Sequence, residues 1–372
     1  MNSHIIKSTS DLASIKDAWD RLYSESNTEN PFLCWEWNDL WINTFFMDGD
    51  INVIVIYDAN EIICIAPFLI KHKTISFLAD NLFADYSDII TSRPDIEVLQ
   101  IVIREMLQIK GWSKLSLMTI PEFSLCLAHF EPIFKNEGVT TATKCVHLNP
   151  FIDTTTNFEE YIAARSNGVR KELRRSKNKL DKTYSEWDFF EAESTNDKME
   201  VVNALIDLHL RRQPGKVGTS IFEDYAHVEF YRNLIKNEEL PWTLHLAGIR
   251  VDGKFVTASI SIIKNDVFYY WMTAFDASVG GGSIGNLHVK FLAQKCFTQE
   301  FKRLDFMGGT EGYKMRWATE SYKNFEVVAY RSSIRFYADK TWAIIRRRLQ
   351  ILKDRHSLVN KVWTRLSKFV GK

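Results

Sequence analysis

Apolar residues recur along this chain with two spacings, three to four residues apart in some segments and two apart in others, and turn residues separate the segments. Helical spacing is seen at Leu12, Ile15, Trp19 and Leu22, and again from Trp37 to Phe45. Strand-like segments follow at 51–57, 61–70, 74–78 and 86–90, then a helix at 95–109 and a strand at 114–120. The pattern predicts helices, a three-stranded meander, a helix and a strand.

The same order of elements returns in the second half of the chain. Helices are expected around 172–180, 199–209 and 228–235, strands at 244–250, 255–263 and 267–275, then a helix at 284–299 and a strand at 303–306. No residue-by-residue repeat accompanies this order, so a duplication rests on the order of elements alone. We expect an α+β fold of two halves, residues 1–150 and 151–335, each a mixed, mostly antiparallel sheet flanked by helices. A tail at 336–372 follows.

Composition fits an enzyme that folds in the cytoplasm. With 372 residues, 45% apolar and 13% aromatic, each half has enough apolar surface for a core of its own. The five cysteines lie among apolar residues, without paired spacing and without neighbouring histidines, which is typical of reduced, buried thiols and argues against a metal site. The N-terminus lacks a signal pattern, and no apolar run approaches the roughly 18 residues that cross a bilayer.

A glycine-rich loop between a predicted strand and a predicted helix is the first candidate for chemistry. The strand at 268–275 is followed by Gly280, Gly281, Gly282, Ser283 and Gly285. Glycines let the backbone approach a ligand closely, and the free N–H groups at a helix N-terminus favour an anion such as a pyrophosphate. The alternative is a mobile turn in which Ser283 caps the next helix.

A polar cluster follows the last predicted strand. The strand at 303–306 runs into Gly308 and Gly309, and the cluster comprises Glu311, Tyr313, Lys314 and Arg316. Binding and catalytic residues are frequent just past strand ends. A solvated surface loop is the alternative. His209 shares the apolar face of its helix with two leucines, so we expect a core histidine there.

Two segments are strongly basic. Between residues 165 and 182, eight Lys or Arg face two acids, and Arg170 and Arg174 belong to one of two positive stripes on the predicted helix. This helix is either a solvated face or a site for an anion. From residue 339 to 372, ten Lys or Arg face two Asp, a local charge of +8. Because apolar residues alternate with these cations, the tail either lies on an anionic membrane surface or packs on protein.

Several of these segments together resemble a known family. The run Asp305 to Lys314 with Trp317, the tripeptide Ser283-Ile284-Gly285 and the basic segment 165–182 are similar to GNAT-superfamily acyltransferases of the cellulose-biosynthesis (CelD/BcsL) type. That family is related to the Fem-type peptidoglycan aminoacyltransferases. The similarity covers about residues 150–320, with a weaker echo at 35–41, 66–67 and 85–88. Relatives often have Ser-Pro-Gly where this chain has Ser-Ile-Gly. Tandem GNAT-like halves are what the Fem relatives imply.

The resemblance implies acetyl-CoA or another acyl-CoA as donor, with no metal. The pantetheine arm would pair with the strand at Met272, Thr273 and Ala274. The pyrophosphate would rest on the loop and helix start, at Gly281, Gly282, Ser283, Gly285 and Asn286. The acyl group would pass directly to an amine, which needs electrostatic stabilisation of the intermediate and a base for the proton.

Three carboxylates are candidates for that base. Glu311 is the first because it belongs to the polar cluster, and Asp305 and Asp85 are next; the alternative is that Asp305 closes a strand and Asp85 makes a turn. Lys314 is a poor base because an unperturbed lysine is charged at pH 7. Lys314 is expected instead to hold an anionic part of the donor or acceptor. Substrate-binding roles are also expected for Arg170, Arg174, Tyr313 and Arg316.

The leading functional prediction is an acyl-CoA-dependent N-acyltransferase of the cell envelope. Its acceptor would be an amino sugar or similar surface-polysaccharide precursor, either a small molecule or lipid-linked. One alternative is a Fem-like transferase that uses aminoacyl-tRNA on a peptidoglycan precursor, the one case in which a nucleic acid is expected as a partner. Another is a GNAT-derived scaffold without catalysis. We expect the protein in the cytoplasm, with possible attachment of the tail to the inner face of the membrane.

Overall fold

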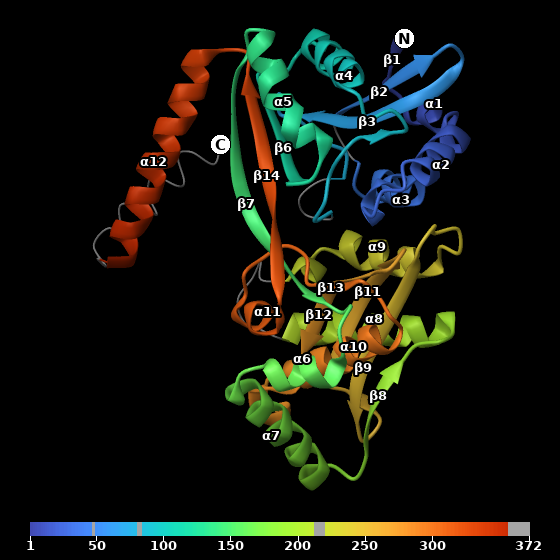
Figure 1. Ribbon diagram of the computed structural model, residues 1–372, viewed down its shortest axis with the longest axis vertical. Coiled ribbons are helices and arrows are strands. Elements are labelled where there is room, and N and C mark those ends of the chain that lie inside the picture. The colour runs from blue at the N-terminus through green and yellow to red at the C-terminus, as the bar shows by residue number, and fades with distance from the viewer. Residues whose placement is uncertain (47–48, 80–83, 212–219, 356–372) are drawn as a thin grey trace.

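The computed structural model describes residues 1–46, 49–79, 84–211 and 220–355, and within them a single mixed sheet runs through the whole molecule (Figure 1). Helices cover both faces of this sheet. The α+β class with two halves of similar plan is confirmed.

The N-terminal half contains the expected meander. Its strands are β1 (Asn2–Ile6), β2 (Asp50–Asp58), β3 (Glu61–Lys71), β4 (Thr74–Phe77) and β6 (Lys114–Pro121), with β5 (Ile90–Thr91) beside β3. On one face lie α1 (Thr9–Ala13), α2 (Lys16–Glu25), the short helix η1 (Pro31–Leu33) and α3 (Trp35–Phe45). On the other lie α4 (Ile96–Gln108) and α5 (Leu125–Asn136). Hairpins join β2 to β3 and β3 to β4 in antiparallel register.

The C-terminal half repeats this plan, as the sequence predicted. Its strands are β8 (Trp187–Glu191), β9 (Thr243–Val251), β10 (Lys254–Phe255), β11 (Thr257–Lys264), β12 (Val267–Phe275) and β13 (Arg303–Asp305). One face is covered by α6 (Phe158–Ala164), α7 (Asn167–Thr183) and α10 (Ile284–Thr298), and α11 (Gly312–Trp317) lies at the edge of that core. The other face is covered by α8 (Thr195–Arg211), η2 (Ile221–Glu223) and α9 (Tyr225–Lys236).

Two long strands join the halves, and the sequence pattern did not predict either of them. Strand β7 (Thr140–Asp153) pairs with β14 (Glu320–Tyr330) along almost its whole length, and its last residues pair with β13. β14 also pairs with β6, so a strand from the end of the chain completes the N-terminal part of the sheet. The boundary expected at residue 150 falls inside β7.

The strand expected at 86–90 is wrong, because only Ile90 and Thr91 form a short bridge to β3. Side-chain bonds hold the preceding residues in an irregular conformation: Tyr86 donates its hydroxyl to Asp305, and the Asp88 carboxylate accepts from the N–H of Ile89. The first expected helix is also divided into α1 and α2 by a turn at Ser14 and Ile15.

One aromatic core connects the two halves. The inner helices α2, α3, α8 and α9 pack into a common cluster between them. At its centre Trp37 of α3 contacts Phe230 of α9 and Trp271 of β12, with ring centroids 5.2 and 5.3 Å apart. Because large aromatic side chains from both halves remove apolar surface from water together, separating the halves would expose this cluster.

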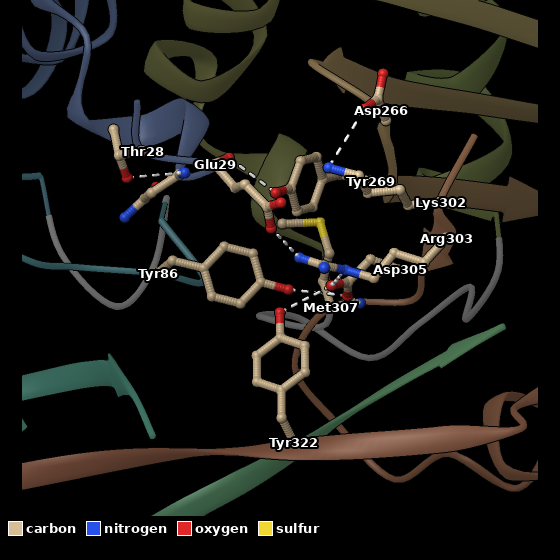
Figure 2. Close-up of polar contacts among 11 residues, drawn as sticks. Thr28, Glu29, Tyr86, Asp266, Tyr269, Lys302, Arg303, Asp305, Met307 and Tyr322 are labelled. Atoms are coloured by element: carbon tan, nitrogen blue, oxygen red, sulfur yellow. Dashed lines mark hydrogen bonds and ion pairs between the residues drawn. The ribbon is translucent and has the colours of Figure 1, made fainter. Parts of the chain in front are cut away.

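A buried polar network reinforces the same junction (Figure 2). Asp305, fully buried at the end of β13, accepts hydrogen bonds from Tyr86 and Tyr322 at 2.9 and 2.8 Å and from the N–H of Met307 at 2.7 Å. Arg303 lies 3.5 Å from the same carboxylate and donates to Glu29 at 2.7 Å. The acid is therefore satisfied by residues from both halves and from β14.

The last described helix, α12 (Ser333–Arg355), leaves the end of β14 and runs clear of the sheet (Figure 1). Among the described residues, none of the helices combines the length and apolar content needed to cross a bilayer.

Candidate active site

A cavity of about 380 Å³ opens beside the second half of β12 and gathers half of the predicted site residues. Its walls come from β12, the start of α10, the end of α8 and the segment that contains α11. The lining residues are His209, Tyr270, Trp271, Met272, Thr273, Phe275, Gly285, Asn286, Val289, Glu311, Tyr313, Lys314 and Arg316. Residues separated by about 100 positions in sequence therefore share one space.

The cavity exists because two parallel strands separate. β12 and β13 pair from Val267 with Arg303 to Tyr269 with Asp305, whereas β12 stays paired with β11 as far as Phe275. The register of β11 and β12 shifts between Ile260 and Ser261, which places Trp271 in a bulge. From Tyr270 onward one edge of β12 thus faces the cavity, and its backbone polar groups there have no strand beside them.

The glycine loop lies at the other wall, at the beginning of α10. Gly280 has a φ of +65°, which a side chain would strain, and Ser176 of α7 donates its hydroxyl to the Gly280 carbonyl at 3.2 Å. Ser283 is the N-cap residue of α10, but its side chain makes no capping bond to the helix. The N–H groups of Asn286 and Leu287 bond to the Ser283 carbonyl. The first N–H groups of a helix have no partner within the helix and can bind a ligand.

Asn286 fixes the helix start to its neighbours through its side chain. Its carbonyl oxygen accepts from the Trp317 indole at 3.0 Å and its amide donates to Glu172 of α7 at 3.1 Å. Glu172 also binds Arg316 through both carboxylate oxygens, at 3.1 and 2.9 Å. Asn286 and Arg316 both line the cavity, but each has a partner already. Their arrangement is positioned before any ligand binds.

Lys314 organises the polar cluster. Its side chain is only 7% exposed, and the ammonium donates to the Gly308 carbonyl at 2.6 Å and pairs with Glu311 at 3.1 Å. Gly309, with a φ of +117°, leaves room for the Glu311 carboxylate, which a β-carbon would displace. Glu311 remains more than half exposed. This cluster places one positive and one negative group together at the cavity wall.

Asp85 from the N-terminal half reaches the same loop from the opposite side. A β-carbon on Gly308 would lie 2.9 Å from the Asp85 carboxylate and 2.7 Å from Nε2 of His147 on β7. Asn324 of β14 donates to the Asp85 carbonyl at 2.7 Å and lies 3.3 Å from His147 Nε2. Burial raises the pKa of Asp85 to about 6, although the nearby ammonium of Lys314 acts in the opposite direction.

His147 stays neutral at pH 7, because burial and the charge of Lys314 both lower its pKa. Sequence analysis missed His147 and Asn324, because they lie on strands that the pattern did not predict. The pair of Asp85 and a neutral histidine beside the polar cluster is an arrangement that can accept a proton from an amine. It depends on three chain segments meeting at Gly308.

Eight predicted site residues do not line the cavity: Asp85, Arg170, Arg174, Ala274, Gly281, Gly282, Ser283 and Asp305. Asp305 serves the buried network described above, and Ala274 is fully buried in the strand. Arg170 donates to Asn167 within α7, and Arg174 projects from the exposed face of the same helix. These residues do not line the cavity, and Arg170 and Arg174 stay predictions for an extended ligand.

His209 lines the cavity, whereas the sequence pattern predicted a core position for it. It is half-buried, its Nδ1 lies 2.8 Å from the Ser220 hydroxyl and its ring contacts Phe222. Tyr270 also lines the cavity and donates to the Thr273 hydroxyl at 2.7 Å. Aromatic residues of a buried strand look like core residues in a sequence, so nothing in the pattern distinguished those facing a cavity.

Comparison with protein families agrees with this geometry. Residues 167–315 match the model of the acetyltransferase (GNAT) domain, and this range includes the glycine loop, both diverging strands and most of the polar cluster. This part of the chain is similar to a GNAT acetyltransferase domain, and the match supports an acyltransferase as the class of enzyme. No match was found among curated proteins.

Solved structures show the same fold over most of the chain. A Bacteroides thetaiotaomicron protein of unknown function aligns with a TM-score of 0.56 at 14% identity, over 88% of this chain and 100% of its own. The C-terminal domain of a putative lysylphosphatidylglycerol synthetase from Agrobacterium fabrum aligns with a TM-score of 0.56 at 13% identity, over 90% of this chain and 95% of its own. FemX aligns with a TM-score of 0.57 at 10% identity, over 88% of this chain and 97% of its own. At these identities the likeness concerns the fold.

Within the described ranges, no three His, Cys, Asp or Glu side chains lie close enough together to hold a metal ion. The free cysteines Cys34, Cys64, Cys126 and Cys296 are buried, whereas Cys145 is exposed, contrary to the expectation of buried thiols throughout.

Proposed function

We propose that this acyltransferase takes its acyl group from acetyl-CoA or another acyl-CoA and transfers it to an amine. The observation that carries the proposal is the open edge of β12 beside the start of α10. The pantetheine arm would extend along the strand edge at Met272 and Thr273. Its diphosphate would lie at the N–H donors of the helix start around Gly285, where the helix dipole favours negative charge.

The remaining groups suit the acceptor side of a direct transfer. The amine nitrogen attacks the thioester carbonyl carbon, a C–N bond forms, the C–S bond breaks, and CoA leaves as a thiolate that takes up a proton. The ammonium proton of the attacking amine passes to a carboxylate. Asp85 fits this role because its raised pKa is closer to neutrality than that of an ordinary aspartate, and Glu311 is the exposed alternative.

We propose that the acceptor is an amino sugar or related precursor of a surface polysaccharide, as for the cellulose-biosynthesis type that the sequence resembles. Lys314 and Arg316 at the cavity wall supply positive charge for an anionic part of the donor or acceptor, in addition to their pairs with Glu311 and Glu172.

Calorimetric titration of the full chain with acetyl-CoA tests the donor. We expect micromolar binding, and we expect Met272→Trp to abolish it by filling the cavity. Met315→Trp is the matched control, because Met315 of α11 is 46% exposed and does not line the cavity. No binding by the wild-type chain, or equal loss in both variants, would refute the acyl-CoA proposal.

A Fem-like reaction with aminoacyl-tRNA is the second candidate. The exposed cations of α7, next to the glycine loop, are the observation that favours it: Lys171, Arg174, Arg175, Lys177, Lys179 and Lys182. Phosphate contacts of this kind make binding strongly salt-dependent. A salt-sensitive tRNA mobility shift without CoA binding would favour this reaction over the first, and binding of neither donor would favour a scaffold without catalysis.

A further inference from the structure

Helix α12 exposes a continuous apolar face. Ile334, Tyr337, Trp342, Ile344 and Ile345 are 82, 62, 46, 50 and 42% exposed. At 100° per residue, Ile334, Ala338, Thr341 and Ile345 fall on one side of the helix. Its contacts with the body lie in the first turns, where Phe336 packs on Tyr330 and Asp339 accepts from the Tyr330 hydroxyl.

This arrangement leaves the helix short of stabilising contacts. Exposed large apolar groups gathered on one face mark a surface that is covered when the protein is at work, whereas single exposed ones do not. Most helices in proteins owe their stability to burial of an apolar face. The exposed face of α12 is therefore suited to contact with another surface.

The charge of the helix identifies the cover. From 333 to 355 there are seven Lys or Arg and two Asp, a net charge of +5. On the helical projection Arg346 and Lys340 lie on opposite flanks of the apolar face, and both are exposed. Cations on both flanks of an apolar face suit a surface that is apolar inside and negatively charged at its rim.

We propose that α12 docks flat on an anionic lipid bilayer, with the face around Ile345 in the boundary between headgroups and acyl chains and the flanking cations at lipid phosphates. This inference is independent of the reaction proposed above. It gives the enzyme a peripheral attachment at one end of β14.

Two segments of this chain that could cover α12 carry the wrong charge. A second copy of α12 would place +5 beside +5. The segment from residue 356 to 372 contains four Lys or Arg and no acid, so it too is positive. Like charges at helix-packing distance are destabilising, whereas each cation near an anionic membrane adds attraction.

Co-sedimentation of the full chain with vesicles tests the proposal. We expect binding to phosphatidylcholine vesicles that contain 30% phosphatidylserine, weak binding to pure phosphatidylcholine, and release at high salt. Lys340→Gln combined with Arg346→Gln should weaken the partition coefficient by about 25-fold, about fivefold for each cation. Ile345→Glu should abolish binding. Lys110→Gln with Lys236→Gln, two exposed lysines outside α12, is the matched control and should bind like the wild type.

Thermal unfolding of each variant separates loss of binding from loss of fold, since none of these side chains lies in a core. Equal binding to neutral and anionic vesicles, or equal loss in the Lys110 and Lys236 control, would overturn the proposal. So would a dimer in sedimentation velocity that Ile345→Glu dissociates while the wild type ignores anionic vesicles, because α12 would then cover a second copy.

Discussion

Replacing Asp85 with asparagine should make the protein more stable at neutral and alkaline pH. The folded state raises the pKa of this carboxyl to about 6, mainly because of burial, while a free aspartate has a pKa of about 3.9. Between these values the folded protein binds more protons than the unfolded chain. The free energy of unfolding therefore falls as pH rises through the window from about 4 to 6.

The size of the effect follows from the shift. About two pKa units correspond to roughly 3 kcal/mol, which the charged side chain costs the folded state above pH 7. Asparagine has the same shape and can still accept the N–H of Gly308, the backbone donor that now bonds the carboxylate. We expect Asp85→Asn to be more stable than the wild type by about 2 to 3 kcal/mol at pH 8, and by little at pH 4.

Urea unfolding of both proteins at several pH values between 4 and 8 measures this difference. Asp181→Asn is an informative control, because hydrogen bonds from Lys177 and Trp187 lower the pKa of this exposed carboxyl. Asp181→Asn should therefore be less stable than the wild type at neutral pH, a change opposite in sign to that of Asp85→Asn. A stability difference for Asp85→Asn that does not change with pH would refute the assigned pKa and with it the choice of Asp85 as base. Acetyl-CoA binding should survive the substitution, since Asp85 lies outside the donor cavity.

Two further substitutions test the junction around this site by urea unfolding. Gly308→Ala brings a β-carbon within 2.7 and 2.9 Å of side-chain atoms and should destabilise the protein by about 1 to 3 kcal/mol. Gly312→Ala is the control, because its β-carbon meets nothing within 4 Å and the variant should be neutral or slightly stabilised. Equal effects of the two substitutions would contradict the close approach at Gly308. Tyr322→Phe removes one hydrogen-bond donor from fully buried Asp305 and should destabilise the protein by about 1 to 3 kcal/mol. Tyr337→Phe, at an exposed position, is the control and should change the free energy of unfolding little. A neutral Tyr322→Phe would mean that the network does not hold the halves together.

Local signals predicted much of the fold because most elements carry their pattern within their own residues. The meander from β2 to β4 and its counterpart from β9 to β12 alternate apolar and turn residues clearly enough to be seen without neighbours. The pattern missed β7 and β14 because these long strands pair with each other across some 180 residues of sequence. β-propensity of this kind depends on cross-strand contacts that a sequence does not display.

The sequence by itself determined the parts of the site that lie within one segment: the glycine loop before α10 and the cluster from Glu311 to Arg316, each specified by glycine and charged residues at short spacing. The tertiary structure alone decided which of these residues share a space and what surrounds them. It separated β12 from β13 to make the cavity, buried Asp305 in a network between the halves, and brought Asp85 and His147 against Gly308. The physical reason is that burial, pKa and strand separation are set by neighbours distant in the chain, whereas helix starts, turns and charge runs are set by adjacent residues.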